Sequence, residues 1–370
     1  MSALFTPLTL RGLSIPNRIA VSPMCQYMAE DGRATSWHLI HLGHLALSGA
    51  AWVCIEATAV EAAGRITPGC LGLWDDATEA ALRPVMAAIR RYSPIAVAMQ
   101  LAHAGRKASS RVPWEGGALI PLEAGGWRPD APSAVPQKEG EAPPQALDEA
   151  GLDRVRDAFV AAARRADRLG IDAIEIHNAH GYLLHEFLSP IANQRGDAYG
   201  GSLENRMRFP LEVFDAVRAA FPAEKPIGVR VSATDWIEGG WDLSQTIAFA
   251  SALKQRGADW VTASSGGVSP LQKIALGPGY QVPFARAVKH ETGINTIAVG
   301  LITEPQQAEE IVASGDADLV ALARAMLYDP RWPWHAAAQL GGQVTAPPAY
   351  WRAPPHGVKD LFGETVYGGR

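Results

Sequence analysis

The feature that most constrains this chain is a repeated alternation of short apolar segments with helical segments. Eight segments are predicted as strands, at residues 18–22, 52–56, 95–101, 172–176, 227–231, 260–264, 296–299 and 319–322. Most are continuous apolar runs rather than alternating ones, which is typical of strands buried on both faces of a parallel sheet. Helices are predicted between them, for example at residues 38–48, 79–91, 152–169, 203–220, 244–256 and 304–314.

Eight βα units in a chain of 370 residues predict an α/β fold, a single-domain (β/α)8 TIM barrel, over residues 1–346. A doubly wound sheet is the alternative, but no GxGxxG motif follows the first strand and no linker divides the chain. Residues 111–150, rich in Pro, Gly and charge, are predicted as a long loop, and such loops are usually functional. Residues 347–370 are predicted as a C-terminal tail.

Charge and composition exclude several classes of protein. The net charge is −5 with no block of like charges, which argues against nucleic-acid binding and against attachment to a membrane surface. There is no apolar run long enough to span a membrane and no pattern typical of a signal peptide. Three scattered cysteines are too few for a disulfide framework and suggest a reducing compartment, so a cytoplasmic protein is expected.

In a TIM barrel the active site lies at the carboxyl ends of the strands, so the residues there are the candidates. Many polar residues, with a few small or apolar ones between them, lie at these predicted ends. The candidates are Ser22, Pro23, Met24, Cys25, Tyr27, Glu56, Ala57, Gln100, His103, His177, His180, Tyr182, Arg230, Gly300, Ala323 and Arg324.

The pair His177 and His180 has three interpretations. A metal site needs further ligands, for which Cys25, His103 and Glu56 are available, but no known spacing supports it. One histidine can be an ordinary core residue. Alternatively, both imidazoles donate to one substrate oxygen, with Tyr182 nearby as a proton source.

The other candidates also have purely structural interpretations. Cys25 is a nucleophile, a metal ligand or a small buried side chain, the last being the usual case. Arg230, at the end of a buried strand, faces either an anionic ligand or a structural partner such as Glu175 or Glu56. Gln100 at a strand end can simply bond the backbone.

The ends of the last two strands indicate a phosphate site. Gly300 and the pair Ala323-Arg324 lie after strands seven and eight, where barrels commonly hold phosphate, although a plain helix start explains them equally.

Taken together, these residues resemble the old yellow enzyme family of FMN-dependent ene-reductases. The resemblance extends over nearly the whole chain, and its motifs are Asn17-Arg18-Ile19, Pro23-Met24-Cys25-Gln26-Tyr27, Gln100-Leu101-x-His103-Ala104-Gly105-Arg106-Lys107, His177-x-x-His180-Gly181-Tyr182, Phe187-Leu188-Ser189-Pro190 and Tyr199-Gly200-Gly201-Ser202. Cys25 together with two histidines is similar to the "thermophilic-like" bacterial class. Trp114-Glu115-Gly116 in the long loop is similar to the xenobiotic reductases of that class.

The resemblance implies a role for each position. Ser22, Pro23, Met24, Cys25, Ala57, Gln100 and Arg230 are expected to hold the flavin ring, and Gly300, Ala323 and Arg324 its phosphate. The residues expected at the substrate are Tyr27, His177, His180 and Tyr182, and Trp351 or Arg352 from the tail of a neighbouring subunit. Tail exchange within a homodimer or homotetramer is therefore expected.

The resemblance also implies the reaction. NADPH, or NADH, is expected to pass hydride to N5 of bound FMN in a ping-pong cycle, and the hydride then goes to the β-carbon of an activated alkene such as an enone, enal, maleimide or nitroalkene. His177 and His180 are expected to bind the activating oxygen, Tyr182 to protonate the α-carbon, and Cys25 to tune the flavin potential. The alternatives are an FMN reductase of nitro compounds or nitrate esters, a metal-dependent lyase, and a barrel without catalytic activity.

Overall fold

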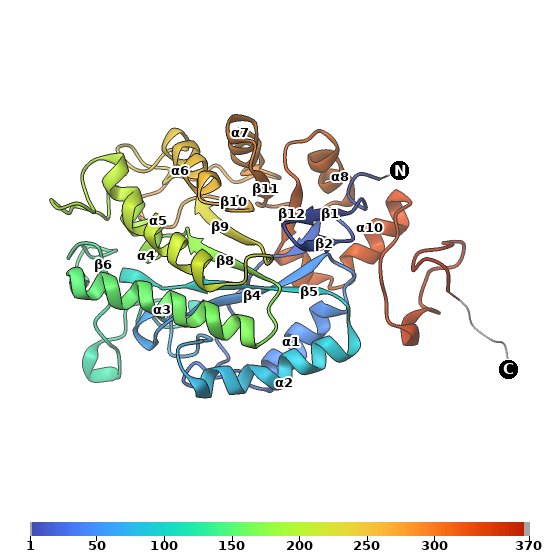
Figure 1. Cartoon of the computed structure of the whole chain (residues 1–370), viewed down its shortest axis with the longest axis horizontal. Helices are drawn as coiled ribbons and strands as arrows, with labels where there is room; N and C mark the ends of the chain where they lie inside the picture. The colour runs from blue at the N-terminus through green and yellow to red at the C-terminus, as the bar shows by residue number, and fades with distance from the viewer. Residues whose placement is uncertain (1, 366–370) are drawn as a thin grey trace.

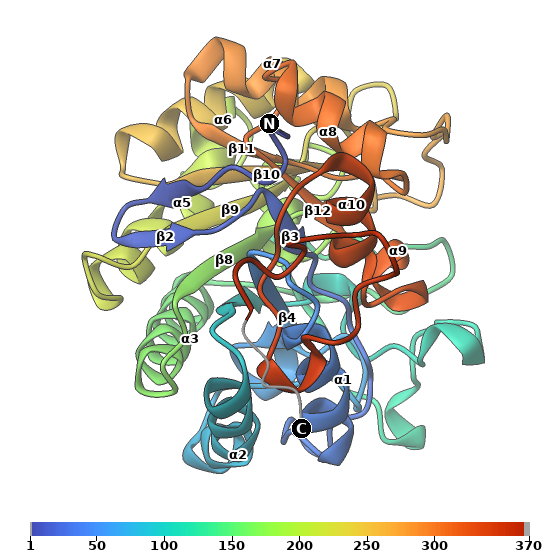
Figure 2. The same ribbon diagram turned by 90° about the vertical axis from the view of Figure 1, so that its right-hand side faces the viewer.

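A computed structural model describes residues 2–365 and shows a closed barrel of eight parallel strands (Figures 1 and 2). Neighbouring strands follow chain order, and the last pairs with the first. The strands are β3 (Ile19–Val21), β4 (Trp52–Ala59), β5 (Ala96–Ala102), β8 (Ala173–Asn178), β9 (Ile227–Ser232), β10 (Trp260–Ser264), β11 (Asn295–Ala298) and β12 (Leu319–Leu322). The predicted TIM barrel is therefore confirmed.

Helices cover the outside of the barrel (Figure 1). They are α1 (Ser36–Ala46), α2 (Asp76–Tyr92), α3 (Glu149–Arg168), α4 (Leu183–Leu188), α5 (Leu203–Ala220), α6 (Leu243–Gln255), α7 (Val282–Thr292), α8 (Pro305–Ala313), α9 (Arg324–Tyr328) and α10 (Trp332–Leu340). Two of them begin three residues before their predicted starts. The carboxylates of Asp75 and Asp148 accept the N–H groups of Thr78 and Gly151, each at 2.8 Å, and these caps set where α2 and α3 begin.

The amino-terminal end of the barrel is closed by a hairpin that the sequence analysis did not predict. Strands β1 (Leu8–Leu10) and β2 (Leu13–Ile15) pair antiparallel. Their Leu10 and Ile15 pack with Trp52 and Trp260, whose ring centroids lie 5.3 Å apart. This apolar layer closes one end of the barrel, so ligands have access only to the carboxyl end of the strands.

The predicted long loop carries structure of its own. It contains the 3-10 turns η3 (Pro113–Glu115) and η4 (Leu122–Ala124) and the short strands β6 (Asp130–Ala131) and β7 (Gln145–Ala146). Because α3 begins at Glu149, the loop ends two residues before its predicted end at residue 150. Trp127 anchors it by donating its Nε1–H to the carbonyl of Ala63 at 2.9 Å.

The described part of the tail folds back on the barrel. Trp334 of α10 packs against Tyr350 and Phe362, and Leu361 accepts the Val344 N–H at 2.9 Å. In Figure 1 the tail lies at the side of β1 and β2, whereas α4 and β6 lie at the opposite end of the barrel. The predicted tail also includes residues 366–370, which lie outside the described residues. Within residues 2–365, no helix combines the length and hydropathy needed to cross a bilayer.

Candidate active site

One cavity at the carboxyl ends of the strands is lined by five of the predicted cofactor residues. They are Ser22, Arg230, Gly300, Ala323 and Arg324. The cavity has a volume of about 220 Å³, and Ser264 and Gln281 add to its polar lining. These residues come from the ends of β3, β9, β10, β11 and β12 or from the segments after them, so barrel closure alone brings them together.

Arg230 is the buried cation of this cavity. It is 9% exposed, and its Nε and Nη1 atoms have no hydrogen-bond partner among residues 2–365. Glu175, one suggested partner, instead accepts hydrogen bonds from Gln100 Nε2 at 2.8 Å and Thr262 Oγ1 at 2.5 Å. Glu56, the other, accepts a backbone N–H elsewhere. An unpaired buried cation is costly, so the site favours an anionic or electron-rich ligand here.

Three aromatic side chains meet at the end of β8. The ring centroids of His177 and His180 lie 5.1 Å apart in a T-shaped arrangement, and the Tyr182 ring lies 5.0 Å from that of His177. Burial, and secondarily the charge of Arg230, lowers the pKa of both histidines well below its ordinary value. Both imidazoles are therefore neutral at neutral pH, and each carries one N–H group.

The neighbours of the two rings constrain where those protons lie. His177 Nδ1 accepts the backbone N–H of Ala179 at 3.3 Å, so its proton is on Nε2. His180 Nε2 lies 2.7 Å from Ser264 Oγ, and the His180 backbone N–H donates to Ser232 Oγ at 2.9 Å. The site thus offers an Nε2–H donor from His177 beside a second, firmly held imidazole.

Tyr182 carries a phenol that keeps its proton. Burial raises its pKa well above the ordinary value, so the side chain is neutral and able to donate. It shares a smaller cavity with the predicted flavin neighbour Ala57, and Gly64, Arg65 and Ala104 also line that cavity. Tyr182 therefore borders a small hollow of about 10 Å³.

The segment after β3 holds Cys25 as a thiol. Burial, with the nearby Cys70 and Glu56, raises the pKa of Cys25 well above its ordinary value, although bonds to Ala57 and Tyr27 oppose this. A protonated thiol is a poor nucleophile, which argues against covalent catalysis. Pro23 is half-buried beside Met24, whose side chain packs against the core.

Tyr27 connects this segment to the long loop. It has a positive φ of 57°, which few residues other than glycine adopt, and its ring meets that of Trp114 edge-on at 5.7 Å. The preceding residue is fixed as well, since the Gln26 N–H donates to Glu56 Oε2 at 2.9 Å. Tyr27 and Trp114 together place the long loop against the segment that carries Cys25.

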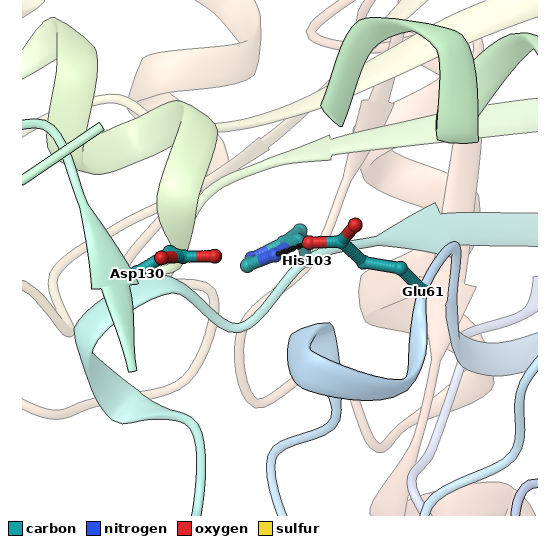
Figure 3. A group of neighbouring side chains, drawn as sticks. All are labelled: Glu61, His103 and Asp130. Atoms are coloured by element: carbon teal, nitrogen blue, oxygen red, sulfur yellow. Dashed lines mark hydrogen bonds and ion pairs between the residues drawn. The ribbon is translucent and has the colours of Figure 1, made fainter. Parts of the chain in front are cut away.

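His103, one of the residues considered as a metal ligand, has other partners in the structure. His103 does not join the other two histidines: its Nε2 lies 2.9 Å from Glu61 Oε1, with Asp130 close by (Figure 3). Arg154 bonds both carboxylates, reaching Asp130 Oδ2 at 2.5 Å and Glu61 Oε2 at 3.2 Å. The guanidinium supplies the positive charge that these acids need, so the cluster is an ion-pair network that ties the long loop to α3.

Trp351 and Arg352 lie away from these cavities in their own chain. They line a hollow formed within the tail itself, together with Lys359, Leu361 and Phe362. Trp351 Nε1–H donates to the carbonyl of Ala346 at 3.1 Å. The structure therefore does not bring them to the histidines of the same chain.

The structure adds residues that the sequence analysis did not assign. Ser264 contacts His180 and ends a strand that was correctly predicted, so its position was a usable signal. Lys107 belongs to a quoted motif and lies over the Tyr182 ring. Thr262 lies inside an apolar run, where no local pattern marks it, and it donates to Glu175, which was considered only as a partner of Arg230.

The sequence model of the NADH:flavin oxidoreductase / NADH oxidase family matches residues 3–343. The chain belongs to this family. The predicted resemblance to old yellow enzymes is thereby confirmed, and the protein is a flavin-dependent oxidoreductase.

Relatives within the family are similar over most of their length. An NADH:flavin oxidoreductase of Gibberella zeae is 45% identical over 359 residues, covering 92% of this chain and 86% of the relative. An NADPH dehydrogenase of a Geobacillus species is 44% identical over 351 residues, covering 94% and 98%.

Solved structures share the barrel. Morphinone reductase is 29% identical with a TM-score of 0.77, covering 93% of this chain and 91% of that one. A 2-naphthoyl-CoA reductase complex has a TM-score of 0.82 at 23% identity, which shows the fold alone. This chain spans about half of it, covering 52% of its length.

The residues of this family member fit FMN. The unpartnered N–H groups of Arg230 suit the electron-rich edge of an isoalloxazine ring, and exposed Arg324 offers a forked donor for a phosphate. Gly300 has a φ of 103°, and a Cβ there would lie 2.6 Å from Gln281 Nε2. Glycine therefore keeps this wall of the cavity open. The prediction of FMN with NAD(P)H as cofactors is confirmed by the family.

Proposed function

We propose that this protein is an NAD(P)H-dependent reductase of activated alkenes. The observation that carries the proposal is the group of neutral His177, neutral His180 and protonated Tyr182 at the barrel mouth. These groups are hydrogen-bond or proton donors placed to meet an oxygen and an adjacent carbon of a ligand. Morphinone reductase, whose name gives morphinone as its substrate, supports this assignment by its similar fold and 29% identity.

The cofactor is assigned to the residues of the larger cavity and the segments beside it. Ser22, Pro23, Met24, Cys25, Ala57, Gln100 and Arg230 would hold the ring of FMN, and Gly300, Ala323 and Arg324 its phosphate. When bound, FMN supplies two-electron transfer from NAD(P)H to the substrate, in a ping-pong cycle. Arg230 contributes a fixed positive charge that needs no reorganisation, as preorganised donors do at developing anions.

The substrate oxygen is assigned to the imidazoles. His177 Nε2–H donates to a carbonyl or nitro oxygen, while its Nδ1 stays bonded to the Ala179 N–H. A hydrogen bond to that oxygen draws electron density away from the conjugated β-carbon and makes it electrophilic. Because the imidazoles are neutral, they stabilise the developing charge without transferring their own protons. Tyr27 is assigned to the same substrate.

The proton for the α-carbon is assigned to Tyr182. Its raised pKa keeps it protonated until the neighbouring carbon becomes strongly basic. Cys25 is assigned a tuning role, since its thiol stays protonated beside the flavin-binding segment.

The tail is assigned to a neighbouring copy of the chain. In Figure 1 the tail lies at the end opposite α4 and β6, remote from the mouth of its own barrel. Trp351 or Arg352 is therefore proposed to enter a neighbour's site in a homodimer or homotetramer. The cytoplasmic location stays a prediction.

The test is anaerobic reduction of the purified yellow protein with NADPH, followed by addition of cyclohexenone. Flavin bleaching and then recovery of the oxidised spectrum are expected. The variants His177→Ala and His180→Ala should still bleach but recover slowly, whereas Tyr182→Phe should spare the NADPH step. Recovery at the wild-type rate in both histidine variants would remove the donor role. Reoxidation by nitroaromatics or nitrate esters, but by no alkene, would favour the alternative substrate class.

A further inference from the structure

Lys107 lies next to the ring of Tyr182, the proposed proton donor, and has no role in the proposal above. It ends the 3-10 turn η2 (Gly105–Lys107) that follows β5. Its Nζ donates to the carbonyls of His180 at 2.9 Å and Gly267 at 3.3 Å, and it lies 5.0 Å from the centroid of the Tyr182 ring. One ammonium group, from the loop after β5, therefore contacts two further loops at the mouth of the barrel.

The backbone that Lys107 holds is strained. His180 has a φ of 60°, a left-handed conformation that is unfavourable for a residue with a side chain. A Cβ on Gly267 would lie 2.5 Å from the His180 Cα, and one on Gly181 would lie 2.2 Å from the Gly267 carbonyl oxygen. The two loops are thus in close contact, and both carbonyls at this contact accept from Lys107.

No carboxylate among the described residues forms a direct ion pair with Lys107. Glu186 of α4 is the acid whose charge acts on Lys107, and its Oε1 accepts the Arg106 N–H at 2.8 Å. Burial raises the pKa of Glu186 to about 8. Burial also lowers the pKa of Lys107 to about 8, with Arg106 and Lys138 adding to the fall and Glu186 opposing it.

We propose that Lys107 is a positioning residue for proton transfer: it holds His180 in its left-handed conformation and places a positive charge against the Tyr182 ring. The inference rests on the proposed function. In the step concerned, the Tyr182 O–H bond breaks, and the electron pair on the substrate α-carbon forms the new C–H bond. The phenolate left on Tyr182 then regains a proton from solvent. An ammonium 5.0 Å from the ring stabilises that phenolate.

The charge state of Lys107 gives the pH dependence. The ammonium is present below pH 8 and is lost above it, so the alkene step should slow as the pH rises through about 8. The neighbouring imidazoles of His177 and His180 are neutral throughout this range and do not contribute. Glu186 ionises over the same range, which makes it the group that the experiment must separate from Lys107.

Stopped-flow reoxidation of the NADPH-reduced protein by cyclohexenone, from pH 6.5 to 9.5, tests the proposal. Wild type should be fast and slow down above about pH 8, Lys107→Arg should stay fast throughout, and Lys107→Met should be slow throughout. A nearby charge moves a pKa by about 1–3 units, here that of the Tyr182 phenol. The rate of reoxidation by cyclohexenone should therefore be roughly 10-fold or more lower in Lys107→Met than in wild type below pH 8. The matched control is Lys273→Met, at an exposed position whose charge is not among those that act on Lys107, and this variant should behave as wild type.

Two reactions separate a local effect from general damage. Flavin reduction by NADPH and reoxidation by ferricyanide, which requires no carbon protonation, should be unchanged in Lys107→Met. Equal alkene rates and equal pH profiles in wild type and Lys107→Met would overturn the inference but leave the proposed function intact. Failure of wild type itself to react with any alkene would instead overturn the proposed function.

A spectroscopic measurement does not depend on turnover. With 13Cζ-labelled tyrosine, the Tyr182 resonance, assigned by its loss in Tyr182→Phe, should shift with a midpoint near pH 8 in wild type. The shift should persist in Glu186→Gln and vanish in Lys107→Met. A wild-type resonance that stays constant from pH 6.5 to 9.5 would overturn the inference, even if the lysine variant did not fold.

Discussion

Replacing Arg230 by Met should stabilise the FMN-free protein and weaken its binding of FMN. The guanidinium is buried, and its Nε and Nη1 have no partner among the described residues. Each unsatisfied buried polar group costs about 1–3 kcal/mol, so the two destabilise the FMN-free fold by roughly 2–6 kcal/mol. Methionine keeps much of the apolar stem and removes both groups. The FMN-free variant should therefore be more stable than FMN-free wild type by about 2 kcal/mol or more.

The same replacement should weaken the binding of FMN. A hydrogen bond from a charged donor contributes about 1.5–3 kcal/mol, so its loss should raise the dissociation constant of FMN roughly 10- to 150-fold. The stability that FMN confers on the fold should fall by the same free energy. The same side chain thus destabilises the empty barrel and strengthens FMN binding, which is the property of a site preorganised for an electron-rich ligand.

Urea unfolding of the FMN-free and FMN-loaded proteins, with FMN affinity from fluorescence quenching, measures both effects. Arg324→Met is the matched control, because this exposed guanidinium lies at the rim of the same cavity. It should change the stability of the FMN-free protein by no more than about 0.5 kcal/mol. If Arg230→Met destabilised the FMN-free and FMN-loaded proteins equally, the guanidinium would be a structural residue and the reasoning would be wrong.

Three further predictions concern the thiol, the histidines and the barrel floor. Cys25→Ala should retain FMN and turnover, and full inactivation with FMN retained would indicate a covalent role for the thiol. Because burial raises the pKa of Cys25, the wild-type thiol should react slowly with iodoacetamide at pH 7. The pKa values of His177 and His180 are lowered, so the unfolded chain binds more protons below its own histidine pKa of about 6.5. The contribution of these histidines to the free energy of unfolding should therefore be fully present above pH 6.5 and decrease below it. Urea titrations from pH 7 to 5 should show a smaller decrease in the free energy of unfolding for a His177→Gln/His180→Gln variant. Gly228→Ala should lower the melting temperature, since its Cβ would lie 2.0 Å from the Trp260 ring, whereas Gly43→Ala in α1, with no atom within 4 Å, should raise stability by about 0.5–1 kcal/mol.

Most of the barrel was predictable because its strands are buried on both faces and read as continuous apolar runs. The predicted strand at residues 260–264 agrees with β10 at both ends, and that at 319–322 agrees with β12. The hairpin of β1 and β2 escaped prediction, since strands of three residues show no measurable periodicity. Its side chains find their partners, such as Trp260, more than 200 residues away.

The candidate site was also predictable only in part. The barrel rule placed Ser22, Arg230 and Gly300 at one end of the molecule before any contact was known, and one cavity does collect them. The rule gave no means of choosing between a ligand and an ion pair for Arg230. That choice depended on Gln100 and Thr262, which occupy the oxygens of Glu175 across neighbouring strands.

The sequence by itself determined the fold class, the end of the barrel that carries the chemistry and the family, because apolar periodicity and local motifs lie within short stretches of chain. Only the tertiary structure decided the state of each group: a neutral His177 with its proton on Nε2, an unpartnered Arg230, and a lysine against the Tyr182 ring. Desolvation and hydrogen-bond partners set those states, and both come from residues distant in sequence that meet only when the eight strands close.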